Sequence, residues 1–313
     1  MTIFDAHCDT VQKITDFGGG LFGNDFHVDI NRIAKSQNQH IQTFAAFIDE
    51  RNDKLKPFFR CEQLIDKYFA EIKKNEEHIK HCNNVSEIKD VLKTGKVAAI
   101  LSVEGGEAIE GAIEKLDYLF SRGVRIMTLS WNYPNEITGS IAEENGNGLS
   151  DFGKQVVRKM NELGMMIDVS HISEKGFWDV LETTKKPILA THSNVKAICG
   201  HRRNLSDEQI CAIIKNGGCI GVNLYSEFLS DMGADINDIF RHIEHILALG
   251  GENNIGLGSD LDGMDSLPNG IKGIEDIYKI FEEMQERGYS EMLWNAMPTA
   301  CATTTLHTLT SRR

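Results

Sequence analysis

Residues 97–131 read VAAILSVEGGEAIEGAIEKLDYLFSRGVRIMTLSW and contain two apolar runs separated by an amphipathic segment. The runs at 97–103 and 126–131 are almost continuously apolar, which is typical of parallel strands buried on both faces. Between them, residues 107–121 repeat apolar side chains at helical spacing, and Arg122 followed by Gly123 is a helix stop signal. The stretch therefore predicts one strand–helix–strand unit with a right-handed crossover.

The same alternation of short apolar runs and amphipathic segments continues along the chain. We expect eight strands, at residues 2–7, 41–48, 97–103, 126–131, 165–170, 188–191, 219–224 and 255–258. Helical patterns lie between them, at residues 61–75, 85–94, 107–121, 149–163, 236–249 and 274–287, and two further helices begin at Ser173 and Ser206. Eight strands that each precede a helix predict an α/β protein with a (β/α)8, TIM-like barrel. An open doubly wound sheet is the alternative.

The barrel domain is expected to span residues 1–299, because no segment rich in Pro, Gly or Ser marks an internal boundary. Residues 300–313, ACATTTLHTLTSRR, are rich in threonine and lack helical periodicity. We expect this tail to be frayed or disordered.

The overall charge limits the classes of partner. The 313 residues include 33 Lys+Arg against 46 Asp+Glu, a formal net charge of -13. Such a surface repels phosphate groups, so nucleic acid and anionic membranes are poor partners. No apolar run approaches the roughly 20 residues of a spanning helix, and the first residues do not form a secretory signal. The seven cysteines include no C-x-x-C pair, so we expect reduced thiols and a cytoplasmic protein.

Polar side chains follow the predicted strands where these strands end. His7 and Asp9 follow the first strand and point the same way, because side chains alternate along a strand. Later strands end at Glu104, His171, His192 and Asp260. An α/β barrel gathers the carboxyl ends of its strands at one mouth, so these groups should converge there. Imidazole nitrogens and carboxylate oxygens are the usual ligands of Zn²⁺ and its first-row neighbours.

Each part of this pattern has an ordinary explanation when it is taken alone. A strand-end histidine can bind a backbone carbonyl, and an acidic residue can pair with a loop. His242 and His245 do not form H-E-x-x-H and are expected on the solvated face of an outer helix. Phosphate-loop and G-x-S-x-G motifs are absent, which disfavours a nucleotide-binding protein and a serine hydrolase. The joint pattern instead indicates a metal centre, with Glu104 suited to bridge two ions about 3.5–4 Å apart.

Six segments carry a resemblance to a known family. They are FDAHCDT (4–10), SVEGGEAI (102–109), IDVSHIS (167–173), ATHSN (190–194), HRRNLSD (201–207) and GLGSDLDG (256–263). In order and spacing they resemble the membrane (renal) dipeptidase family over residues 3–295. That family consists of zinc dipeptidases with an amidohydrolase-like barrel, and this chain looks like a bacterial-type member without an anchor.

The resemblance implies a role for each strand-end residue. His7 and Asp9 are assigned to one zinc ion, His171 and His192 to a second, and Glu104 bridges the two. It also implies that Arg203 binds the substrate carboxylate and that Asp260 is the catalytic carboxylate. A homodimer and tolerance of a D-residue at the C-terminal position of the substrate are further implications.

The sequence departs from the family after the fourth strand. Mammalian members carry a substrate-site histidine there, whereas this chain has Trp131 beside Asn132. Stabilisation of the oxyanion is then left to zinc alone, or is helped by Asn132 or Asn135. Tyr225 and Asn223 are expected either to form pocket walls or to pack within the barrel.

These residues predict a zinc-dependent dipeptidase. A hydroxide held between two metal ions attacks the peptide carbonyl, Asp260 shuttles the proton to the leaving amine, and Arg203 anchors the free carboxylate. Two alternatives stay open at this stage. The barrel could hydrolyse another carboxylate-bearing amide, a lactone or a phosphoester, or the chain could be a non-catalytic metal-dependent binding protein.

Overall fold

The computed structural model describes residues 1–289, so the expected frayed tail at 300–313 lies outside the described residues. Parallel strands form the central sheet. Their bounds are β1 Thr2–Asp5, β2 Gln39–Phe47, β3 Ile79–His81, β4 Val97–Glu104, β5 Val124–Thr128, β6 Met166–Asp168, β7 Leu189–Ala190, β8 Cys219–Val222 and β9 Ile255–Leu257.

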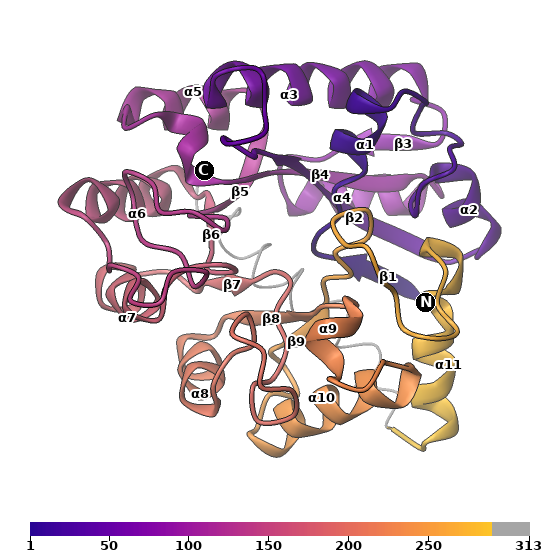
Figure 1. The fold of residues 1–313 in the computed structure, drawn as a ribbon. Coiled ribbons are helices and arrows are strands. Elements are labelled where there is room, and N and C mark those ends of the chain that lie inside the picture. Colours follow the sequence, from indigo (N-terminus) through magenta and orange to yellow (C-terminus); the bar gives the residue numbers. More distant parts are fainter. Residues whose placement is uncertain (290–313) are drawn as a thin grey trace.

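Eight of these strands close into a ring. β1 pairs with both β2 and β9, and β2 pairs with β4, so the order around the ring is β1, β2, β4, β5, β6, β7, β8, β9. Figure 1 shows the helices arranged around this ring. The predicted (β/α)8 barrel is therefore confirmed, and the alternative of an open sheet is wrong.

The strand β3 was not predicted. It pairs with the first residues of β4 at Ile79 and Val97, whereas the later part of β4 pairs with β5. Only Ile79 of its three residues is buried, so β3 leaves no hydrophobic pattern for sequence analysis to detect.

The helices that cover the barrel have the following bounds: α1 Thr10–Asp16, α2 Ile30–Lys35, α3 Pro57–Lys74, α4 Val85–Lys93, α5 Ile113–Ser121, α6 Asp151–Leu163, α7 Glu174–Thr183, α8 Asp207–Asn216, α9 Ser226–Leu229, α10 Ile236–Ala248 and α11 Tyr278–Glu286. Short 3-10 helices lie at Gly106–Ile109 and Ile274–Asp276. The predicted helix at 107–121 begins late, because Glu110 (φ 46°) and Gly111 (φ 67°) are left-handed and interrupt it. Ser173 and Ser206 cap α7 and α8 as predicted.

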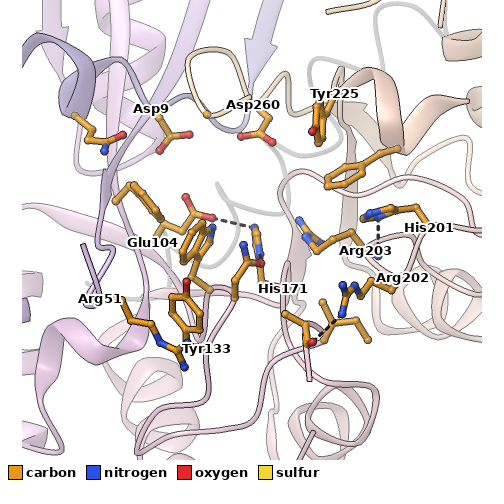
Figure 2. A pocket seen from close by; sticks show the side chains of 18 of the residues that line it. Asp9, Arg51, Glu104, Tyr133, His171, His201, Arg202, Arg203, Tyr225 and Asp260 are labelled. Carbon is orange, nitrogen blue, oxygen red and sulfur yellow. Dashed lines mark hydrogen bonds and ion pairs between the residues drawn. The ribbon is translucent and has the colours of Figure 1, made fainter. Parts of the chain in front are cut away.

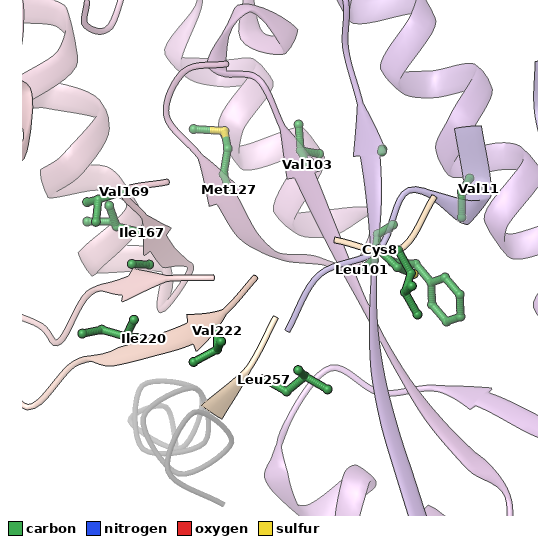
Figure 3. Close-up of a cluster of buried hydrophobic side chains, with 14 of the residues drawn as sticks. Cys8, Val11, Leu101, Val103, Met127, Ile167, Val169, Ile220, Val222 and Leu257 are labelled. Atoms are coloured by element: carbon green, nitrogen blue, oxygen red, sulfur yellow. The ribbon is translucent and has the colours of Figure 1, made fainter. Parts of the chain in front are cut away.

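The core has two parts. One cluster lies between the outer faces of the strands and the helices, and Figure 3 shows Val103, Met127 and Val222 among its members. The other cluster takes alternate residues of the strands, namely Phe4, Ala6, Ile41, Ala98, Ile100, Ile126, Met166, Leu189 and Cys219. Because neighbouring residues of a strand point to opposite faces, this second cluster fills the barrel interior. Glu104 and Asp168 continue the inner faces of β4 and β6 toward their carboxyl ends.

Two expectations need correction. His242 is buried on α10, where its ring contacts the Val195 amide and the Leu229 carbonyl, both at 3.0 Å, so it does not lie on a solvated face. Among residues 1–289, the free cysteines are Cys8, Cys61, Cys82, Cys199 and Cys211, whereas Cys219 is disulfide-bonded and departs from the expectation of reduced thiols. Within residues 1–289, no helix combines the length and the hydrophobicity that crossing a bilayer requires.

Candidate active site

Glu104 lies at the centre of a buried cluster of imidazoles and carboxylates at the barrel mouth. Its Oε2 atom is 3.1 Å from Nε2 of His7, and its Oε1 atom is 3.1 Å from Nε2 of His171 and 3.5 Å from Nε2 of His192. Asp9 completes the cluster, with Oδ2 3.4 Å from Nε2 of His7. The structure thus brings together all five residues that the sequence analysis proposed as metal ligands.

The donor atoms form two groups that share Glu104. One contains His7, Asp9 and Glu104, and the other contains Glu104, His171 and His192, with all donor atoms of a group within 4.8 Å of one another. Two buried atoms, Nε2 of His7 and Oδ1 of Asp9, form no hydrogen bond with any described residue. Buried polar atoms normally have a partner, so a positive ion is the kind of group that these atoms fit.

The far ring nitrogens of two histidines are held by oxygen atoms. Nδ1 of His171 is 3.1 Å from Oδ1 of Asn132, and Nδ1 of His192 is 2.9 Å from Oγ1 of Thr191. The two Nε2 atoms are left facing each other at 2.9 Å. Holding one ring nitrogen while the other faces the site is how proteins orient histidine ligands. The residues present therefore fit metal ions.

The protonation states of Glu104, His171 and His192 suit cation binding. Burial, assisted by the positive charge of Arg203, lowers the pKa of His171 to about 4. Burial and the charge of His7 lower the pKa of His192 well below its usual value. For Glu104, burial acts to raise the pKa, but contact with His7 and His171 holds it well below the ordinary range. Neutral imidazoles and an ionised carboxylate are the forms that coordinate metals.

Asp260 faces the same cluster from the loop after β9. Its ligand atom lies within 4.8 Å of those of His7 and His192, and its Oδ2 atom accepts a hydrogen bond from Nδ2 of Asn223 at 2.8 Å. Burial raises the pKa of Asp260 to about 7, and the negative charge of Asp9 adds to this shift. A carboxyl group with such a pKa can both accept and release a proton at neutral pH.

Asp262, two residues after Asp260, points elsewhere, although alternation along a strand would place the two side chains on the same face. Its carboxylate accepts hydrogen bonds from Oγ1 of Thr10 at 2.5 Å and from the amide of His27 at 2.7 Å. The alternation rule fails because β9 ends at Leu257, and both aspartates lie in a loop with positive φ angles, 60° and 72°. Through these two contacts Asp262 holds the loop in place.

Gly263 shows how closely the backbone passes the two site carboxylates. A Cβ atom at this position would collide with Oδ2 of Asp9 and Oδ1 of Asp260. Only a residue without a side chain leaves both carboxylates in place.

The cluster forms part of the lining of a cavity of about 810 Å³, which Figure 2 shows from close by. Arg203 reaches this cavity from the loop after β7 and is buried. One of its terminal nitrogens donates to the carbonyl of His192 at 3.2 Å, while its Nε atom has no hydrogen-bond partner among the described residues. Tyr225 and Trp131 also line the cavity.

The structure gives different positions to Asn132 and Asn135, the two residues that the sequence analysis considered for stabilising the oxyanion. Asn132 lines the cavity, although its Oδ1 atom is engaged with His171. The Asn135 amide donates to Glu107 and to the Leu129 carbonyl, at 3.0 and 2.9 Å, so Asn135 supports a loop and is not available for substrate.

Residues 1–297 match the family model of membrane dipeptidase, peptidase family M19. The chain belongs to this family. An uncharacterized dipeptidase of Schizosaccharomyces pombe is 32% identical over 290 residues, a match that covers 84% of this chain and 66% of the yeast protein. The M19 membership predicted from the six sequence segments is thus confirmed.

Solved structures share the fold of this M19 chain. Dipeptidase AC, a metallopeptidase of family M19, has a TM-score of 0.87 and 26% identity, covering 99% of this chain and 98% of its own. A metallopeptidase from Rhodobacter sphaeroides, solved with a phosphinate mimic of the dipeptide L-Ala-D-Ala, has a TM-score of 0.85. At 24% identity, over 99% of this chain and 98% of that one, the second likeness concerns the fold alone.

Proposed function

We propose that this protein is a zinc-dependent dipeptidase that binds two metal ions. The observation that carries this proposal is the sharing of Glu104 between two groups of donors. His7 and Asp9 would hold one ion, His171 and His192 the other, and Glu104 would bridge them. Membership of a dipeptidase family supports the reaction class.

The bound metal ions would supply an activated water as nucleophile and polarise the scissile carbonyl. Asp260 then takes the proton of the attacking water at Oδ1, because Oδ2 is engaged by Asn223, and returns it to the leaving amine. Arg203 pairs with the free carboxylate of the substrate, where a planar guanidinium can form two parallel hydrogen bonds. Asn132 and Tyr225 complete the walls of the substrate pocket.

Other features of the proposal rest on the family resemblance or on the sequence. These are tolerance of a D-residue at the C-terminal position, a homodimer, a barrel domain extending to residue 299 and a cytoplasmic location. The buried Arg203 favours dipeptides and other carboxylate-bearing amides over uncharged lactones, because its charge needs an anionic partner.

A substrate panel tests the function directly. We expect a dipeptide such as Ala-Ala to be hydrolysed faster than its C-terminal amide, a tripeptide, an N-acetyl amino acid, a lactone and a phosphoester. Faster hydrolysis of the N-acetyl amino acid or the lactone would replace the dipeptidase proposal with the wider amidohydrolase alternative. Metal binding without hydrolysis of any of these compounds would favour the alternative that the chain is a non-catalytic metal-dependent binding protein.

Arg203→Ala should weaken transition-state binding by roughly 2–5 kcal/mol, because it removes the buried partner of the substrate carboxylate. The measurement is kcat/KM for a dipeptide and for its C-terminal amide. The variant should lose the preference for the free acid. Arg202→Ala is the matched control, since Arg202 is exposed and donates to the Ala142 carbonyl. An Arg203→Ala enzyme that still prefers the free acid would refute the anchor role.

A further inference from the structure

Asp168 carries a buried carboxylate that takes no direct part in the proposed reaction. It ends β6 and is completely inaccessible to solvent. Oδ1 accepts hydrogen bonds from the amides of Ser170 (3.0 Å) and Thr191 (2.9 Å). Oδ2 accepts hydrogen bonds from the hydroxyls of Thr128 and Thr191, each at 2.6 Å. Four donors therefore surround this carboxylate, and one hydroxyl links it to the metal cluster.

That link is Thr191, whose hydroxyl also lies 2.9 Å from Nδ1 of His192. A hydroxyl has one proton, and an ionised carboxylate can only accept, so the proton of Thr191 belongs to the bond with Asp168. The contact with His192 is then a hydrogen bond only if Nδ1 of the imidazole carries its proton. The remaining nitrogen, Nε2, keeps its lone pair and faces Glu104 at 3.5 Å.

We propose that Asp168 and Thr191 are positioning residues that fix the tautomer and the ring orientation of His192. The inference rests on the proposed metal site and extends it beyond the five ligands. A neutral histidine has two tautomers, and only the one protonated at Nδ1 presents Nε2 to a metal ion. Loss of a residue that hydrogen-bonds a metal-binding histidine typically lowers metal affinity 10–100-fold.

Two threonines provide a matched experiment. Thr191→Val and Thr128→Val each remove one hydroxyl that donates to Oδ2 of Asp168 at 2.6 Å, but only Thr191 contacts His192. Affinity for Zn²⁺ is measured on the full chain by competition with a chelator, and the melting temperature of the metal-free protein reports any general destabilisation. Thr191→Val should bind Zn²⁺ about 10–100-fold more weakly, and Thr191→Ser should restore the affinity. Thr128→Val should bind as the wild type does.

Three outcomes would overturn the inference. Thr191→Val could bind Zn²⁺ as tightly as the wild type, both valine variants could weaken binding equally, or serine could fail to rescue. A wild-type chain that binds Zn²⁺ but hydrolyses no dipeptide would contradict the proposed function and leave this inference standing, so the two failures are distinguishable.

A separate set of contacts concerns the substrate. The guanidinium carbon of Arg51 lies 3.6 Å from the ring centroid of Tyr133, which packs edge-on against Trp131 at 5.5 Å. Figure 2 shows Arg51 and Tyr133 below Glu104, whereas Arg203 lies to its right, beyond His171. No carboxylate of the described residues lies within 4.0 Å of the Arg51 guanidinium. Arg51 is therefore an oriented cation without an anionic partner at the cavity wall.

We infer that this subsite takes dipeptides whose N-terminal residue carries a carboxylate side chain. The inference also rests on the proposed function. A dipeptide with its C-terminal carboxylate at Arg203 and its scissile bond beside Glu104 extends its first residue away from Arg203, and Arg51 and Tyr133 line another part of the same cavity wall. The guanidinium stacked on Tyr133 keeps its N–H edges available for a carboxylate.

Glu-Ala and Gln-Ala test this preference, because their side chains have the same shape and differ in charge. We expect kcat/KM to favour Glu-Ala about fivefold in low salt, the scale of a partly exposed ion pair, and the ratio to fall to about one in Arg51→Gln. Lys13→Gln, which changes another cation of the cavity lining, should retain the ratio. The inference is wrong if the wild type shows no preference, or if Lys13→Gln alone removes it. Hydrolysis of neither peptide would instead contradict the proposed function.

Discussion

Stripping the metal ions from the purified protein with a chelator should abolish dipeptide hydrolysis, and adding Zn²⁺ back should restore it. Bulk water has a pKa of 15.7, whereas a metal site lowers it to about 7, so we expect a loss greater than about 10⁴-fold. Metal analysis of the active protein should find close to two ions per chain, because the donors form two groups around Glu104. Full activity of thoroughly metal-free protein would refute the proposed mechanism.

Metal binding should also depend on pH in a defined direction. Burial acts to lower the pKa of His7, but the charges of Glu104 and Asp9 raise it well above its usual value, and burial raises the pKa of Asp9 to about 6. Both groups must lose protons to bind a metal, so affinity should already fall as pH decreases toward neutrality, through His7, and fall further through about pH 6, through Asp9. His171 and His192 contribute little, because their lowered pKa values leave them neutral. Competition titrations at pH 6 and pH 8 measure this difference.

The sequence predicted the parts of the site that depend on strand ends. Glu104 closes the fully buried β4, and His171 and His192 come shortly after β6 and β7. A parallel barrel brings such positions to one mouth regardless of the details of the loops. The residues proposed as metal ligands can therefore be named from the sequence alone.

Contacts between side chains of different strands could not be predicted from the sequence. For Asn223 the sequence left open a pocket wall or packing within the barrel, and it did not predict the hydrogen bond that Asn223 donates to Asp260. The bond from Thr191 to Asp168 likewise depends on how β6 and β7 are placed when the barrel closes. The side chains of Asp260 and Asp262 point in different directions because both residues have positive φ angles. The hydrophobic periodicity of a sequence does not reveal such angles.

Asp260→Asn should keep the fold and much of the metal while losing roughly 10²–10⁴-fold in turnover, the usual scale of general acid–base catalysis. The amide has nearly the same shape, and its oxygen can still accept the hydrogen bond from Asn223, but it cannot carry the proton. KM should change less than kcat, because Arg203 and the metal ions still hold the substrate. The measurement is kcat and KM on protein whose metal content has been determined.

Asp262→Asn is the control that distinguishes the two aspartates. The substitution turns one carboxylate oxygen of residue 262 into an amide nitrogen. Either the Thr10 hydroxyl or the His27 backbone amide then loses the oxygen to which it donates. This should cost about 1–3 kcal/mol of stability, while metal-loaded enzyme keeps most of its turnover. The reverse result, with Asp262→Asn the slower enzyme, would show that the roles are misassigned. Loss of metal from Asp260→Asn in proportion to activity would make Asp260 a ligand, a role that its place within 4.8 Å of the His7 and His192 donor atoms also permits.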